Sequence, residues 1–250
     1  MFYHNINPVI LDLGFAEIRW YGVIFAIGFL LTYFFLTYYA KNRKIHNFKE
    51  SDVIDFLIVA VISVIVGSRL FEILFYNLAY YLQNPLQMLM FWKGGLSFHG
   101  GLVGLVIGAY FFCKKKKVRL LQLGDYVIIP VALGLSLGRF ANFINSELYG
   151  TRTNLPWCVN FKNAEGCRHP SQIYESFKNL AIFFVLFFTE RKKKPREGTI
   201  FFLFLILYGT IRFLIEFVKD LPVVFLGLKM GQVFCLFMVI TGLVFLIKKK

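Results

Sequence analysis

Residues 18–44 read IRWYGVIFAIGFLLTYFFLTYYAKNRK, a mainly apolar run over 18–40 followed by a cluster of positive charges. A helix needs about 20 mainly apolar residues to cross a bilayer, so this run is long enough. Basic residues directly after such a run are typical of its cytoplasmic end. The residues before it contain no basic stretch and no small-residue cleavage site, so we expect the helix to remain rather than be removed as a signal peptide.

The rest of the chain repeats this pattern of long apolar runs. Of its 250 residues, 58% are hydrophobic and only 17% are charged, compared with about 25% in an average soluble domain. Too few charged side chains are present to cover a water-exposed surface. Hydropathy predicts seven transmembrane helices, over residues 18–40, 52–76, 95–113, 121–143, 171–189, 199–217 and 231–247. We therefore expect an all-α, polytopic membrane bundle that forms a single integral membrane domain over residues 1–250.

The net charge of +14 lies in short clusters rather than on one face. Basic residues follow the first, third, fifth and seventh predicted helices, at 41–44, 114–119, 191–196 and 248–250. The opposite loops hold few of them, so the positive-inside rule places the N-terminus outside and the C-terminus in the cytoplasm. Such clusters are typical of contacts with anionic membrane lipids. Nucleic-acid binding requires a basic face on a folded domain, so we expect no nucleic-acid partner.

Two segments on the predicted outer side are not apolar enough to span. Residues 145–170 are polar and too short for a core of their own, so we expect a small extracytoplasmic cap over the bundle. Cys158 and Cys167 lie in this cap. A disulfide and two free thiols both remain open, because an oxidising compartment permits the bond without requiring it. Residues 77–92 predict an amphipathic piece along the membrane interface, with Trp92 in the aromatic belt.

Ionisable side chains inside membrane helices are costly and usually face a partner or a polar cavity. Three arginines lie in apolar runs with polar or acidic neighbours, namely Arg69 with Glu72, Arg139 with Asn142 and Glu147, and Arg212 with Tyr208 and Glu216. Each group is either an ion bridge that joins helices or a binding site for an anion. Two arginines near the outer leaflet suit a phosphate, since guanidinium contacts phosphate oxygens in a planar, bidentate manner. Glu147 and Glu216 are predicted to orient the arginines or to accept a proton.

Two histidines stand at predicted outer helix starts. His99 lies between paired glycines in GGLSFHGG (94–101); these allow close approach of backbone or a lipid headgroup, and imidazole exchanges protons near neutral pH. A helix-start histidine that donates to backbone is the alternative. His169 precedes Ser171, Gln172 and Glu175, a pattern that fits capping of a first turn at least as well as chemistry. The sequence has no histidine or cysteine spacing typical of a metal site, so we predict no catalytic metal.

Residues 138–150, GRFANFINSELYG, resemble the signature G-R-x-x-N-F-x-N-x-E-x-x-G of the prolipoprotein diacylglyceryl transferase family at every fixed position. IRWYG (18–22), GLSFHGGL (95–102), RHPSQIYE (168–175), YGTIRFLIE (208–216) and MGQ (230–232) are similar to the family's other landmarks, in the family's order. The resemblance covers nearly the whole chain. It departs from the family where Ser68 replaces a glycine or alanine and Lys219 an arginine, and where a short cap carries the cysteine pair.

This resemblance implies a seven-helix bundle in the bacterial cytoplasmic membrane with its site toward the outer leaflet. It implies transfer of the sn-1,2-diacylglyceryl group from phosphatidylglycerol to the lipobox cysteine of a prolipoprotein, which forms a thioether and releases glycerol 1-phosphate without a cofactor. By similarity, the functional residues are Tyr21, His99, Arg139, Asn142, Glu147, Gly150, Tyr208, Arg212 and Glu216. Among them, Asn142 and Tyr208 are expected to add neutral hydrogen bonds. Tyr21 either contacts the lipid headgroup or belongs to the aromatic belt.

These residues suggest a mechanism. The nucleophile is the acceptor thiol, so a base must remove its proton. We assign that role to a neutral His99, with Glu147 or a water as alternatives. Arg139 and Arg212 are expected to stabilise the negative charge that develops on the leaving phosphate.

A membrane transporter is the main alternative function, since paired intramembrane charges also line ion pathways. Against it, the charged groups lie toward one side of the predicted bundle, and no pair of broken helices marks an inverted repeat. A non-catalytic membrane scaffold is a further alternative, but a scaffold has no need of three buried arginines.

Overall fold

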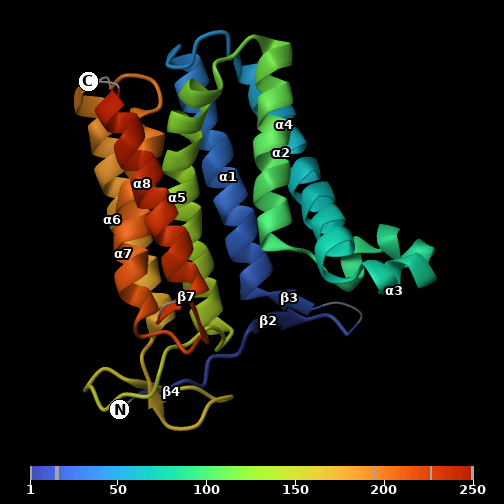
Figure 1. Cartoon of the computed structure of the whole chain (residues 1–250), viewed down its shortest axis with the longest axis vertical. Coiled ribbons are helices and arrows are strands. Elements are labelled where there is room, and N and C mark those ends of the chain that lie inside the picture. The colour runs from blue at the N-terminus through green and yellow to red at the C-terminus, as the bar shows by residue number, and fades with distance from the viewer. Residues whose placement is uncertain (1, 15–16, 194, 226, 249–250) are drawn as a thin grey trace. The chain divides into compact units, whose positions relative to one another are not determined.

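The computed structural model describes residues 2–14, 17–193, 195–225 and 227–248, and this part of the chain is mostly helical. Its eight α-helices are α1 (Trp20–Lys41), α2 (Glu50–Phe71), α3 (Leu78–Gln83), α4 (Phe98–Lys116), α5 (Leu120–Ile144), α6 (Ser171–Lys193), α7 (Thr199–Glu216) and α8 (Met230–Lys248) (Figure 1). The seven long helices lie where hydropathy predicts them, with ends that differ by a few residues. Lys194, Lys249 and Lys250, members of the predicted basic clusters, lie outside the described residues.

Five of the described helices are long and apolar enough to cross a membrane. They are α1, α5, α7, α8 and α2, which the π-helical turn η1 (Glu72–Tyr76) continues. By this measure the chain is a multi-pass membrane protein. The other two long helices carry more charge: α4 ends in three lysines, and α6 contains both acidic and basic side chains. That these two also cross the membrane stays a prediction.

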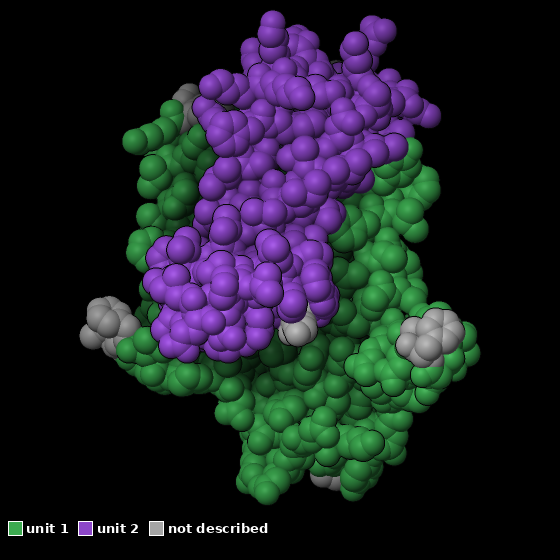
Figure 2. Space-filling model, turned by 90° about the vertical axis from the view of Figure 1, so that its right-hand side faces the viewer, with its two compact units in different colours: residues 1–34, 124–250 green, residues 35–123 purple. Residues whose placement is uncertain are grey.

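The chain forms two compact units, which Figure 2 shows in different colours. One unit comprises residues 1–34 and 124–250, and in it α7 packs against both α6 and α8. The other comprises residues 35–123, and in it α2 packs against α4. Glycines permit this second contact: a Cβ atom at Gly104 would collide with the Ser63 carbonyl oxygen and lie 3.0 Å from the Cα atom of Gly67. The prediction of one membrane domain over residues 1–250 stays a prediction.

Short strands, which hydropathy does not predict, lie between the long helices and before α1. β1 (Phe2–Tyr3) pairs in parallel with β4 (Val159–Asn160), which pairs antiparallel with β5 (Cys167–Arg168). Two antiparallel pairs are formed by β2 (Val9–Asp12) with β3 (Glu17–Arg19) and by β6 (Val223–Phe225) with β7 (Leu228–Lys229). Strands of two to four residues are too short to show a period of two in the sequence.

The 145–170 segment contains β4, β5 and a disulfide between Cys158 and Cys167. Of the two thiol states left open by the sequence, the structure therefore has the bonded one. Arg152 pairs with Arg168 in an isolated bridge. Arg168 also places its Nη1 atom 2.8 Å from the Oδ2 atom of Asp220. The contact with Asp220 fastens the segment to the chain that follows α7.

The ion bridge that the sequence left open for Arg69 and Glu72 is not among the contacts of the described residues. Arg69 instead donates from Nε to the Met88 carbonyl at 3.0 Å and from Nη1 to the Gly94 carbonyl at 2.8 Å. Glu72 accepts a hydrogen bond of 2.6 Å from Asn77. A guanidinium has five donors, and the loop after α3 brings several carbonyl acceptors within reach of Arg69.

That loop continues the predicted interfacial piece. After α3 it forms the 3₁₀ turns η2 (Pro85–Leu89) and η3 (Phe91–Lys93). Leu86, Leu89 and Trp92 are exposed along it. The placement of these apolar side chains in a membrane interface stays a prediction.

Candidate functional site

The densest group of charged side chains in the described residues surrounds Glu175, a fully buried carboxylate near the start of α6. Arg139 of α5 places its Nε atom 2.7 Å from Oε2 of this carboxylate. Arg212 of α7 contacts Oε1, and Lys219, which follows α7, places Nζ 2.5 Å from Oε1. Side chains from three parts of the chain therefore converge on one carboxylate. We call Glu175, Arg139, Arg212 and Lys219, with Glu216, the Glu175 cluster.

Helical spacing brings Glu216 into this cluster. Arg212 and Glu216 are four residues apart on α7, and Arg212 Nε lies 2.9 Å from Glu216 Oε2. Glu216 is fully buried. Gly231, at the start of α8, leaves room for it, because a Cβ atom there would lie 2.5 Å from Glu216 Oε1. Lys229 Nζ donates to the backbone carbonyl of Glu216 at 2.7 Å and to that of Lys219 at 2.5 Å. The positive charge of Lys229 therefore lies at the carboxyl end of α7 and supplies hydrogen bonds to carbonyls that the helix leaves without donors.

The family signature lies at residues 138–150, which we call the signature segment. It reaches the cluster through Asn142. Arg139 Nη1 donates to Asn142 Oδ1 at 3.5 Å, and Asn142 Nδ2 donates to Glu147 Oε1 at 2.7 Å. Asn145 donates to the same Glu147 oxygen at 3.4 Å. The structure does not pair Glu147 with Arg139 directly. The described contacts link Glu147 to Arg139 through the Asn142 amide, and whether Glu147 orients this arginine or accepts a proton stays a prediction.

The first turn of α6 holds the signature segment rather than capping its own helix. Gln172 Nε2 donates to the Glu147 carbonyl at 2.7 Å, and Ser171 Oγ donates to the Leu148 carbonyl at 2.9 Å. These two bonds differ from the capping bonds that the sequence left open as an alternative to chemistry. Leu148 has a φ of 59°, a left-handed conformation that strains a leucine, and the turn needs these bonds to satisfy its carbonyls.

Gly150 lies where two backbones approach closely. A Cβ atom at this position would collide with the carbonyl oxygen of Val218 and lie 2.8 Å from the Cβ atom of His169. Gly150 forms an isolated antiparallel bridge with Lys219. The glycine thus lets the backbone that carries Lys219 lie against the signature segment, which brings the lysine toward Glu175.

Two of the predicted tyrosines lie near charged groups of the same unit. Tyr21, in the first turn of α1, is within electrostatic reach of Glu147 and Arg139. Tyr208, one turn before Arg212 on α7, has the Lys178 Nζ atom 3.6 Å from the centre of its ring.

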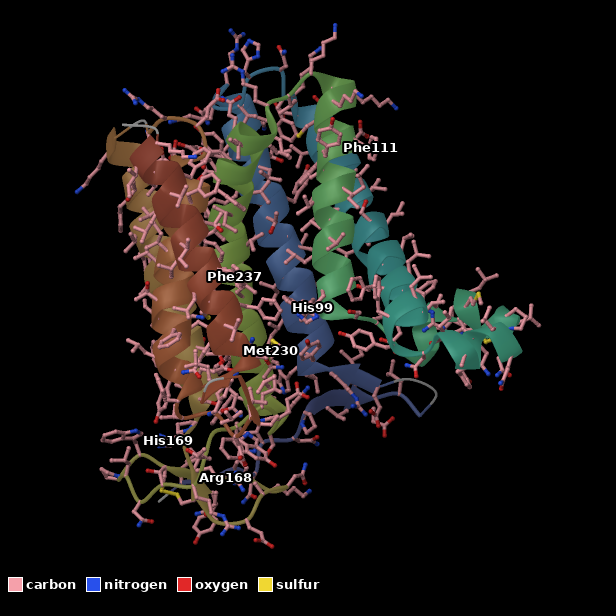
Figure 3. The ribbon with its side chains drawn as sticks, in the orientation of Figure 1. His99, Phe111, Arg168, His169, Met230 and Phe237 are labelled. Carbon is pink, nitrogen blue, oxygen red and sulfur yellow. A yellow bond between two sulfur atoms is a disulfide. The ribbon has the colours of Figure 1, made fainter. Side chains whose placement is uncertain are left out.

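The two histidines differ in their surroundings. His99 is exposed at the start of α4, with its ring 5.8 Å from that of Phe98 and 6.5 Å from that of Phe71. It belongs to the unit of residues 35–123, whereas the Glu175 cluster belongs to the other unit. His169 lies in the chain before α6 (Figure 3), where Nδ1 is 3.3 Å from the Tyr174 hydroxyl. Burial lowers the pKa of His169 below the ordinary histidine value.

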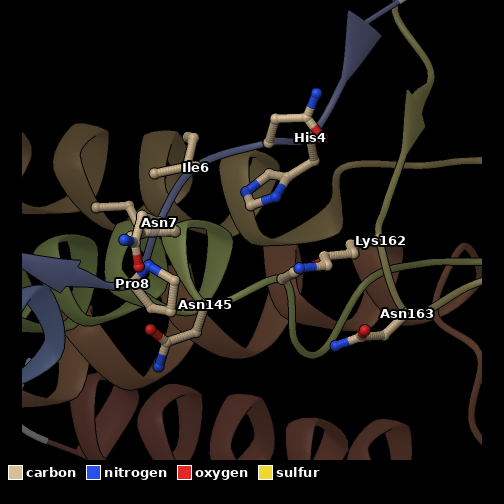
Figure 4. Close-up of a pocket in the computed structure, with 10 residues that line it drawn as sticks. His4, Ile6, Asn7, Pro8, Asn145, Lys162 and Asn163 are labelled. Atoms are coloured by element: carbon tan, nitrogen blue, oxygen red, sulfur yellow. The ribbon is translucent and has the colours of Figure 1, made fainter.

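A cavity of about 500 Å³ adjoins the signature segment (Figure 4). Its lining includes Asn145 and Ser146, which follow α5, together with His4 from the N-terminal segment and Lys162. Asn145 connects this cavity to the Glu175 cluster through Glu147, Asn142 and Arg139.

Within the described ranges, no three His, Cys, Asp or Glu side chains gather in an arrangement that could hold a metal ion. The prediction that the protein uses no metal or cofactor stays a prediction.

Comparison with known proteins identifies the family to which the chain belongs. A family model described as prolipoprotein diacylglyceryl transferase matches residues 8–248. The chain belongs to the prolipoprotein diacylglyceryl transferase family. It is therefore a transferase, as the resemblance of its motifs implied.

Proteins of this family from several bacteria are similar to the chain over nearly its full length. A phosphatidylglycerol–prolipoprotein diacylglyceryl transferase from Geobacter sulfurreducens is 40% identical and covers 97% of this chain and 95% of its own. A protein with the same name from Ehrlichia ruminantium is 42% identical over 96% of this chain and 95% of its own. One from Rickettsia canadensis is 41% identical over 97% and 96%.

The family motifs include Arg139, Arg212 and Glu216 and also Glu175, the last residue of RHPSQIYE (168–175), but they do not indicate that Glu175 lies at the centre of the group. A carboxylate at the start of an apolar helix is the same signal as an arginine within one, and it could have marked Glu175. In the sequence Lys219 stands out only as a departure from the family pattern, and Lys178 belongs to none of the motifs.

Proposed function

We propose that this protein transfers the sn-1,2-diacylglyceryl group of phosphatidylglycerol to the lipobox cysteine thiol of a prolipoprotein. A thioether forms, and glycerol 1-phosphate leaves. Family membership supports the reaction class, and the names of the relatives support the lipid donor and the prolipoprotein acceptor. The relatives' family does not favour the transporter alternative.

The observation that carries the proposal is the surplus of positive charge at Glu175. Arg139, Arg212 and Lys219 lie around two buried carboxylates, Glu175 and Glu216. Three cations and two anions leave one positive charge in a region of low dielectric, where unpaired charge is costly. The phosphodiester of phosphatidylglycerol carries one negative charge. Arg139, whose side chain is 23% exposed, is the member of the cluster most open to such a ligand.

The arginines then act on the leaving group. As the carbon–oxygen bond breaks, negative charge builds on the phosphate, and the guanidinium groups stabilise it more in the transition state than in the ground state. Glu175 and Glu216 hold Arg212 from two sides, which fixes its orientation before the substrate binds. Asn142 is positioned by Glu147 to add a neutral hydrogen bond.

The remaining assigned residues act on the acceptor thiol and the headgroup. We assign proton removal from the thiol to His99, on the basis of its chemistry and sequence context, with Glu147 or a water as the alternatives. Tyr21 and Tyr208 are assigned to headgroup contacts, and Gly150 to the close packing that positions Lys219. No metal and no other cofactor is included in this mechanism.

We further propose seven membrane crossings in the bacterial cytoplasmic membrane, with α4 and α6 in addition to the five apolar helices. At 1.5 Å per residue, the 19 residues of α4 and the 23 of α6 reach about 28 and 34 Å, enough for the hydrocarbon core. The basic clusters place the N-terminus outside and the C-terminus in the cytoplasm. The 145–170 segment is then an extracytoplasmic cap, where a disulfide is stable.

Transfer in proteoliposomes of phosphatidylglycerol with a synthetic lipobox peptide tests the proposal, with the thioether product measured by mass spectrometry. Arg139→Ala and Arg212→Ala should each lower turnover by at least about 10²-fold, the loss typical of one charge-stabilising donor. Arg191→Ala is the matched control, because Arg191 is an exposed arginine of α6 that stacks on Phe187. Near-normal turnover in both cluster variants would refute the phosphate role.

A further inference from the structure

Lys178 is a buried lysine that the mechanism above does not use. It lies on α6 three residues after Glu175, and only 5% of it is exposed. Its Nζ atom has no hydrogen-bond partner among the described residues. This Nζ atom stands 3.6 Å from the centre of the Tyr208 ring and within electrostatic reach of Glu175, Arg212 and Arg139.

A buried ammonium needs a counter-charge, and the available carboxylates already have partners. Glu175 contacts Arg139 and Lys219 at 2.5–2.7 Å, and Arg212 as well. Glu216 is held by Arg212. A ring face attracts a cation but does not neutralise it. When Lys178 is protonated, four cations lie near two buried carboxylates, so the surplus rises from one positive charge to two.

This inference rests on the proposed reaction. In that reaction the phosphate gains one negative charge, the same size of change as the one positive charge that Lys178 adds. The acceptor thiol gives its proton to a base, and its sulfur bonds to the glyceryl carbon. The carbon–oxygen electron pair remains on the phosphate oxygen. A diester with one negative charge thus becomes a monoester with two, because the second phosphate pKa is about 6.

We propose that Lys178 is a positioning residue that matches the charge of the Glu175 cluster to the dianionic leaving group. Its ammonium is too deeply buried to touch the lipid. Lys178 acts through its contribution to the electrostatic field of the Glu175 cluster. It also acts through Tyr208, whose ring it contacts. Lys178 therefore stabilises the phosphate after charge has moved onto it more than the phosphate of the bound lipid.

Two soluble anions that differ by one charge test this role. Glycerol 1-phosphate is a dianion at pH 8, and glycerophosphoglycerol, the deacylated donor, is a monoanion. In proteoliposomes of phosphatidylglycerol with a lipobox peptide, Lys178→Met should raise the inhibition constant of glycerol 1-phosphate about tenfold and that of glycerophosphoglycerol at most about twofold. The kcat should fall about tenfold, while KM for phosphatidylglycerol changes by less than about twofold.

Two further variants separate charge from packing. Lys178→Arg keeps the charge and should restore the selective inhibition by the dianion. Lys192→Met removes an exposed lysine of the same helix and should change neither constant. If Lys178→Met does not fold, Lys178→Gln removes the charge with less change of polarity and takes its place.

An equal rise of both inhibition constants, or a rise of neither, would overturn the role of Lys178. That result leaves the proposed function intact as long as the unsubstituted protein forms the thioether. Absence of thioether formation by the unsubstituted protein would contradict the proposed function itself.

Discussion

Arg139 Nε lies 2.7 Å from Oε2 of Glu175, a carboxylate from another helix with no exposed surface. The contact joins the end of α5 to the start of α6. It also places the signature arginine next to Arg212, which contacts the other oxygen of the same carboxylate. Glu175 therefore decides where both guanidinium groups stand, and any ligand phosphate has to approach them in the positions that this carboxylate fixes.

Replacement of Glu175 tests its place at the centre of the cluster. In Glu175→Gln, two arginines and a lysine lose their shared counter-ion and repel one another. Loss of one partner from a buried ion pair costs about 3–5 kcal/mol, so we expect a clear fall in the thermal unfolding temperature and loss of transfer activity. Glu165→Gln breaks an exposed pair with Arg152 and should cost at most about 1 kcal/mol. Equal stability of the two variants would contradict the central role of Glu175.

Transfer rates can separate the two candidate bases. The structure gives Glu147 two amide donors, Asn142 and Asn145, which both bond to its Oε1 atom. We therefore expect His99→Gln to lower the rate of the chemical step by about 10²-fold or more, the range of general base catalysis. Glu147→Gln keeps an acceptor oxygen for Asn142 and should be milder. Single-turnover thioether formation in both variants decides the matter, and the reverse order of effects would assign the base to Glu147.

Gly150→Ala tests the close approach of two backbones. The added methyl group would meet the carbonyl oxygen of Val218 and the side chain of His169, and such overpacking costs about 1–3 kcal/mol. Displacement of the neighbouring backbone moves Lys219 from Glu175, so transfer should fall together with the unfolding temperature. Gly134→Ala, where a Cβ atom has no neighbour within 4 Å, is the matched control and should leave both quantities unchanged or raise stability slightly. Normal activity of Gly150→Ala would show that this packing does not position the lysine.

Thiol titration tests the disulfide. The denatured protein should show two reactive thiols, those of Cys113 and Cys235, and four after reduction. The bond closes a short loop, so its removal in Cys158→Ser/Cys167→Ser should destabilise the 145–170 segment by about 2–3 kcal/mol, seen as faster proteolysis there. Cys113→Ser should leave the difference of two thiols on reduction unchanged. The same thiol count with and without reductant would rule out the bond.

The pH dependence of stability should include a contribution from His169. Because burial lowers the pKa of this histidine, the unfolded chain binds the proton more readily than the folded chain. The free energy of unfolding should therefore fall as pH drops below about 6.5, the ordinary histidine pKa, and the contribution should be complete above it. Unfolding temperatures at pH 5 and pH 8 should differ less in His169→Gln than in His46→Gln, which removes an exposed histidine. Identical pH dependence in both variants would contradict this assignment.

Hydropathy predicted the seven long helices because length and apolarity are properties of consecutive residues. It did not predict the short strands or the loop that surrounds Arg69. An arginine and a glutamate three residues apart indicate an ion pair, but Arg69 is held by carbonyls from residues that follow much later in the chain. Only the fold brings those carbonyls into reach.

The motifs likewise named residues without their partners. Arg212 and Glu216 share a helix face, so their ion pair follows from helical spacing. The contacts of Glu175 with Arg139, Arg212 and Lys219 join positions 36, 37 and 44 residues apart, and no local pattern encodes them. They depend on how α5, α6 and α7 pack.

The sequence by itself determined that this chain has membrane-crossing helices and carries the signature of its family, since composition and residue order suffice for both. The tertiary structure alone decided which carboxylate holds the arginines, that Glu147 contacts Asn142, and that Lys178 is buried with no hydrogen-bond partner for its Nζ atom among the described residues. Charges interact across space over distances that sequence separation does not report, so the balance of charge at a buried site is settled by packing.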